Sequence, residues 1–156
     1  MNGMQRVFFV YAELLDEARR RAWLQFSRKQ QVDHVVGGIQ RWTWGQITDA
    51  EALAGFRELA RKGFEHACGS SITSVESDAL AASAWLATAI VKTLELGPKL
   101  TPSIEINWAV SSADTYICAV FMRSGLPGHV VVPAFLKWAL ADDDPVTAEE
   151  LGRPRL

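Results

Sequence analysis

The sequence predicts a single α+β domain in which an antiparallel sheet packs on a buried central helix with further helices around it. Three observations lead to this prediction. Residues 79–91 contain no charged side chain, apolar stripes at helical spacing precede them, and alternating or short apolar segments follow them. A helix that is apolar all round is typical of a buried position. Helices followed by strands, with little βαβ alternation, are typical of α+β folds.

The N-terminal half is predicted to be mostly helical, with one or two strands. Residues 7–11 are a short apolar run that fits either a strand or the lead-in to a helix. A helix should follow, because one apolar face recurs at steps of three and four residues. That face comprises Tyr11, Leu15, Ala18, Ala22 and Phe26. Gly37-Gly38 is the first predicted break, and residues 39–47 are predicted to be a strand.

Two helices are predicted in the middle of the chain. Thr48 to Glu51 has the spacing of a capping box, which favours a helix start, and Gly69 is expected to end that helix. The helix that contains the charge-free run should be capped by Ser77 or Asp78, extend to about Leu96 and stop at Gly97-Pro98. The run itself is shorter than the roughly 20 apolar residues that cross a bilayer. It is therefore predicted to be the core helix of a soluble domain.

The C-terminal half is predicted to hold the main part of the sheet. Residues 104–110 alternate between apolar and polar side chains, residues 115–122 are nearly all apolar, and residues 129–132 form a third short run. Such runs, separated by turn residues, indicate a meander of about three strands. A helix from Pro133 would complete the domain at residues 1–141. Residues 142–156 are predicted to be a C-terminal turn and tail.

Charge and composition restrict the possible functions. The formal net charge is −2, which argues against a broad electrostatic surface for nucleic acid. The first residues lack the basic segment and apolar core of a signal peptide. We therefore expect a cytoplasmic protein without a membrane partner, in which Cys68 and Cys118 stay reduced.

The common catalytic and metal-binding motifs are absent from the sequence. His66, Cys68, Cys118 and His129 have the right chemistry for zinc, but residues two apart on a helix point in different directions. Cys68 would lie near a helix C-terminus, where the helix dipole raises the pKa of a thiol. We therefore predict no catalytic residue, no metal and no cofactor.

Two features remain as candidate partner- or ligand-binding residues. Trp42 and Trp44 would lie on one face of a strand with Arg41 on the other, and tryptophan and arginine are enriched at binding hot spots. Glu105 and Asn107 would share the polar face of the sheet. The alternatives are that the tryptophans cover core helices and that the polar pair is an ordinary solvated sheet face.

These features favour a small soluble protein that acts through protein–protein interaction, as an inhibitor, an immunity-like neutraliser or an adaptor. Its partner would be another protein, and a homo-oligomer is possible. The alternative is a small-molecule-binding or enzymatic α+β domain. Its pocket would lie between sheet and central helix, with Glu105, Asn107, Asp114 or His66 as polar groups. A structural subunit of a larger assembly is a third possibility.

Overall fold

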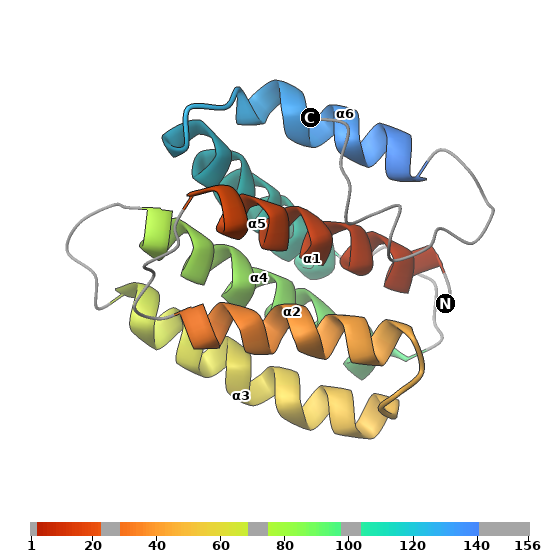
Figure 1. Cartoon of the computed structure of the whole chain (residues 1–156). Coiled ribbons are helices and arrows are strands. Elements are labelled where there is room, and N and C mark those ends of the chain that lie inside the picture. The colour runs from red at the N-terminus through yellow and green to blue at the C-terminus, as the bar shows by residue number, and fades with distance from the viewer. Residues whose placement is uncertain (1–2, 23–28, 69–74, 98–103, 141–156) are drawn as a thin grey trace.

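The computed structural model of the chain describes residues 3–22, 29–68, 75–97 and 104–140, and these residues form helices and turns only (Figure 1). The helices are α1 (Gly3–Ala22), α2 (Lys29–Thr43), α3 (Asp49–Cys68), α4 (Val75–Leu96), α5 (Ile104–Arg123) and α6 (Gly128–Leu140). The predicted α+β class is therefore wrong, because the described part of the chain is all-α and has no sheet. The predicted tail, residues 142–156, lies outside the described residues.

The charge-free run forms the middle of α4, and the prediction of a buried central helix is confirmed. Helix α4 packs against α1, α2, α3 and α5, and nearly every residue between Asp78 and Ile90 is buried. Over its full length, Val75–Leu96, α4 is the one described helix that is long and apolar enough to cross a membrane, judged by length and composition. Within its most apolar window, 61% of the residues are buried inside the fold, as expected of a core helix.

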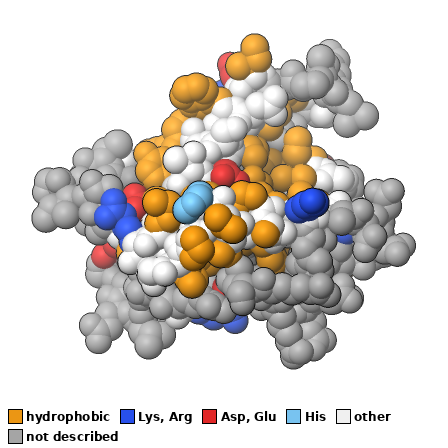
Figure 2. Space-filling model, turned by 90° about the horizontal axis from the view of Figure 1, so that it is seen from above, with side chains coloured by type: hydrophobic (Ala, Val, Ile, Leu, Met, Phe, Trp, Pro, Cys, Tyr) orange, Lys and Arg blue, Asp and Glu red, His pale blue; other side chains and the backbone are white. Residues whose placement is uncertain are grey.

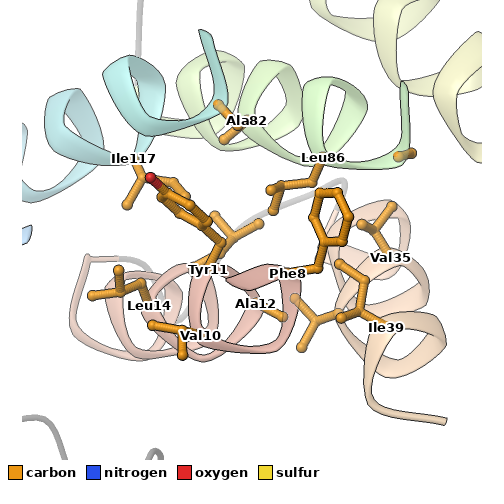
Figure 3. Packing of buried hydrophobic residues seen from close by; sticks show 14 of the residues in the cluster. Phe8, Val10, Tyr11, Ala12, Leu14, Val35, Ile39, Ala82, Leu86 and Ile117 are labelled. Carbon is orange, nitrogen blue, oxygen red and sulfur yellow. The ribbon is translucent and has the colours of Figure 1, made fainter. Parts of the chain in front are cut away.

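The core lies where α1, α2, α4 and α5 meet (Figure 3). Phe8 of α1 and Leu86 of α4 point toward one another, with Val35 and Ile39 of α2 beside them. All four side chains are fully buried. Burial of this apolar surface is the main term that stabilises the arrangement.

The two longest predicted strands of the C-terminal half belong to a single helix, α5. Its buried residues recur at steps of three or four up to Val120, with Phe121 adjacent, and this helical stripe continues through residues 111–114, where the sequence predicts the turn between the two strands. They are Ile106, Ala109, Ala113, Ile117, Val120 and Phe121. The alternation over residues 104–110 matched a strand only locally, because a seven-residue window covers less than two turns of helix.

The other predicted strands are also helical. Residues 39–43 are the last turn of α2, and residues 129–132 are the first turn of α6. Gly37 and Gly38 lie inside α2 instead of breaking it. At Gly38 an added Cβ would come within 3.2 Å of the Phe56 ring, so this glycine allows α3 to approach closely. Tertiary packing here outweighs the usual preference of glycine for turns.

The start of α3 is as predicted, and its outer face carries ion pairs. The backbone N–H of Glu51 donates to the Thr48 hydroxyl over 3.2 Å, as in a capping box. On the outer face, the Arg61 guanidinium lies 3.1 Å from the Glu65 carboxylate. Helix α4 ends at Gly97, whose φ of 67° is the left-handed conformation that glycine adopts at helix ends. The predicted end of α3 at Gly69 lies outside the described residues.

Candidate interaction site

The C-terminal end of α2 gives Trp42 and Trp44 different roles. Gly45 has a φ of 74°, and the N–H groups of Gly45 and Gln46 donate to the carbonyls of Trp42 and Arg41 over 3.1 and 2.8 Å. This pattern is a Schellman motif, in which a left-handed glycine closes the helix. Trp42 lies within the last helical turn, and Trp44 stands just after it. The predicted shared strand face of the two tryptophans is therefore wrong.

Trp42 is a core residue. It is only 4% exposed, and its ring lies 6.1 Å from Phe8 and 6.4 Å from Phe56, measured between ring centroids. Its indole N–H donates to a carboxylate oxygen of Asp49 over 2.9 Å. That bond joins the end of α2 to the start of α3, so Trp42 fixes the hairpin of these two helices.

Trp44 and Arg41 lie together at the surface. Trp44 is 47% exposed, and its ring meets the edge of Phe9 of α1 with a centroid distance of 5.8 Å. Both side chains line a surface pocket of about 340 Å³, together with Phe9, Gly37, Gln40 and Gln46. Within the described residues, Arg41 has no ion pair. The pocket therefore combines an available cation with an aromatic surface.

Arg41 also lines a second pocket, of about 380 Å³, between α2 and α3. Buried Phe56 and Ala52 lie in it, and His34, Glu51 and Glu58 contribute exposed polar groups. The full lining is His34, Gly38, Arg41, Ile47, Glu51, Ala52, Gly55, Phe56, Glu58 and Leu59. Arg41 thus forms part of the wall of both pockets. We call the surface around Arg41, Trp44 and these two pockets the α2–α3 surface.

Glu105 and Asn107 do not share the sheet face that the sequence predicts for them. Both are exposed, but two residues on a helix are about 200° apart around its axis, so they diverge. The Glu105 carboxylate lies 3.5 Å from the Lys92 ammonium of α4. Neither residue lines the two pockets of the α2–α3 surface.

Of the remaining candidates, Asp114 and Cys118 have structural roles, and others have side chains that are not among the described ones. Asp114 accepts a hydrogen bond from the Tyr11 hydroxyl over 2.8 Å and one from the Cys118 thiol over 3.6 Å. Burial, followed by the nearby Asp114 charge, raises the pKa of the Cys118 thiol to about 11, so at neutral pH it stays a weakly nucleophilic thiol. The side chains of His66 and Cys68 are outside the described part. Among the described residues no cluster could hold a metal ion.

A buried carboxyl group lies behind the α2–α3 surface. Glu13 of α1 is 5% exposed and accepts a hydrogen bond from the Gln40 amide over 2.8 Å. Burial raises the pKa of Glu13 above its ordinary value, although the bond from Gln40 opposes this shift. The folded state thus binds the proton more tightly than the unfolded chain does. Stability from this group falls as the pH rises through the interval between the two pKa values.

Replacing Glu13 with glutamine is therefore expected to have a pH-dependent effect. The variant keeps an oxygen that can accept from Gln40 and removes the buried charge. The compared quantity is the melting temperature of the variant minus that of the wild type. We expect this difference to be more positive near pH 7 than near pH 4, where the wild-type carboxyl is largely neutral. Thermal unfolding followed by circular dichroism at both pH values measures the difference. A difference that does not change with pH would contradict the raised pKa.

Sequence reasoning missed His34, Glu51 and Glu58 as lining residues of the α2–α3 surface. Their place in this surface depends on how α2 and α3 face each other, which the periodicity of each helix does not show. A signal was present in the glycines: Gly38 and Gly55 both line the pocket between the helices. Glycine in a helix interior costs about 1 kcal/mol relative to alanine, so two glycines in neighbouring helices point to a close approach or an open surface.

Comparison with protein-family models, curated proteins and solved structures gives no match for this chain. Over the residues that the structure describes, fold and site define an all-α protein with a central apolar helix and a surface recess at the α2–α3 hairpin.

Proposed function

We propose that the protein acts by binding another protein through the α2–α3 surface. The observation that carries the proposal is the position of Arg41, which lines two adjacent pockets and lies beside the half-exposed Trp44. Arginine and tryptophan contribute strongly to binding energy when a partner covers them. The edge-to-face contact with Phe9 restricts the Trp44 ring, so less side-chain freedom has to be lost on binding.

The chemistry of the surface indicates what kind of group would bind there. A guanidinium group can bind a carboxylate with two parallel hydrogen bonds, and the Trp44 ring can receive an apolar side chain. The amides of Gln40 and Gln46 line the same pocket and can bond to a peptide backbone. A partner segment with an acidic residue close to an apolar one would fit this arrangement.

Affinity purification from the cells in which the protein occurs tests the proposal. We expect a protein to co-purify with the wild type and to be lost, by tenfold or more, with Trp44→Ala and with Arg41→Ala. Arg57→Ala is the matched control, because Arg57 is an exposed arginine of α3 outside both pockets and pairs with Glu95 over 3.1 Å. Equal recovery with Trp44→Ala and the wild type would contradict the assignment of this surface.

Binding of a small molecule in the 380 Å³ pocket is the second candidate function. Its volume lies within the range of ligand sites, and buried Phe56 supplies an apolar wall beneath charged groups. A thermal-shift screen with metabolites distinguishes the two functions, because a ligand that binds the native state raises its melting temperature. A stabilising metabolite whose effect disappears in Gly55→Leu, a change within the pocket, would favour the small-molecule function.

A further inference from the structure

The outward face of α5 carries large apolar side chains at both ends and small hydroxyl side chains at its centre. Ile104, Trp108 and Met122 are 86%, 67% and 54% exposed, and they follow one another at helical spacing on the side opposite the buried stripe. Between Trp108 and Met122 the same face carries the exposed residues Ser111 and Thr115. Large side chains thus occupy both ends of the face and small ones its centre. We call these five residues the α5 stripe.

The α5 stripe is complementary to itself when two copies of the helix run antiparallel. With the centre of pairing at residue 113, Ile104 of one copy lies opposite Met122 of the other, and Ser111 lies opposite Thr115. Trp108 lies opposite Cys118 and next to Ala119, so a large ring meets small side chains. Small residues at the centre let the two helices approach closely, and each bulky end covers the other.

Charges beside the α5 stripe match in the same register. Glu105 and Arg123 lie on the same flank of the stripe, each one residue after an apolar member of it. In an antiparallel pair of helices, equivalent flanks face each other, so Glu105 of one copy lies near Arg123 of the other, twice per dimer. Their side chains are 72% and 40% exposed. The Arg123 guanidinium is held by the buried carboxylate of Asp78, which accepts from its Nε over 2.6 Å.

We propose that the protein forms a symmetric homodimer through antiparallel pairing of the α5 stripe with that of a second copy. The register places two apolar contacts and one opposite-charge contact on each side of the two-fold axis. A single patch that is complementary to itself forms a closed dimer instead of an open chain. This interface lies on α5, apart from the α2–α3 surface, and leaves that surface open.

Sedimentation equilibrium over a concentration series tests the dimer. We expect the wild type to approach twice the 17.2 kDa mass of one chain, and Trp108→Asp to remain monomeric over the same range. Trp44→Asp is the matched control, since it makes the same change at another exposed tryptophan, and it should stay dimeric. Glu105→Arg should weaken the dimer about tenfold, because two attractive pairs become repulsive. The result for Glu105→Arg can be interpreted even if Trp108→Asp does not fold.

The outer face of α6 provides the competing interface. Figure 2 shows hydrophobic side chains gathered around a histidine on the face seen from above, and Val130 of α6 is 57% exposed. Val130→Asp should leave the dimer intact. Loss of the dimer with Val130→Asp but not with Trp108→Asp would overturn the proposal, as would a wild type that is monomeric at every concentration.

The antiparallel register has its own test. In a background without Cys68 and Cys118, the double variant Ile104→Cys with Met122→Cys is expected to form an intermolecular disulfide under mild oxidation. Each single variant should form much less, because each new thiol then lies opposite an apolar side chain. Disulfide formation that is equal in the single and double variants would overturn this register.

Discussion

Replacing Trp42 with alanine is expected to lower the free energy of unfolding by about 3–5 kcal/mol, the range for truncating a large buried aromatic side chain. Trp42 is 4% exposed and packs on Phe8 and Phe56. Its truncation removes this packing and leaves a cavity at the junction of α1, α2 and α3. It also removes the hydrogen-bond donor to Asp49. Urea unfolding followed by circular dichroism measures the loss.

Trp44→Ala is the control for this prediction, since the same side chain is removed two residues further along. Trp44 is half exposed, and the one ring contact that the structure describes for it is with Phe9. We expect a loss of about 1 kcal/mol, within the range of a single aromatic pair. Similar losses for the two variants would contradict the division into a core and a surface tryptophan.

The wrong prediction of a strand at residues 39–47 follows from local residue preferences. Tryptophan and β-branched residues are enriched in strands, and the run from Ile39 to Ile47 contains several of them. Gly37 and Gly38 suggested a break before it. The structure continues α2 through both glycines because Phe56 of α3 occupies the space that a side chain at Gly38 would need. Contacts with a distant helix decided this local structure.

Helix α4 was predictable because its apolar run is longer than a strand and has no strand-like punctuation. The start of α3 was predictable because a capping box is a local signal. Helix α5 was not, since all its buried residues except Phe121 are small or β-branched and outward positions such as Ile104 and Trp108 are also apolar. An exposed apolar face weakens the contrast between the two sides of a helix on which periodicity depends.

The candidate site was predictable only in part. Arg41 and Trp44 meet at one pocket, although in a strand they would lie on opposite faces. Glu105 and Asn107 would share a face in a sheet, but they diverge in a helix. The residues of α3 that complete the α2–α3 surface depend on how two helices face each other. One chain's periodicity contains no direct signal for that facing.

The crossing of α3 and α4 is expected to tolerate no side chain at Gly63. A Cβ there would lie 2.8 Å from the Cβ of Ala84 and 3.3 Å from its Cα, so the two backbones would have to separate. We expect Gly63→Leu to lower the free energy of unfolding by about 1–3 kcal/mol, as overpacking of a core does. The loss would be measured by urea unfolding monitored by circular dichroism.

Gly55→Leu makes the same change in the same helix without the clash. An added Cβ at Gly55 meets nothing within 4 Å, and leucine favours helix over glycine by roughly 0.5–1 kcal/mol. We therefore expect Gly55→Leu to raise the free energy of unfolding by about that amount. If the two variants change the free energy of unfolding in opposite directions, α3 needs glycine at position 63 for close packing against α4. At position 55 the glycine then lies at an open surface, where a side chain is tolerated. Equal effects would mean that α3 and α4 are not in such close contact.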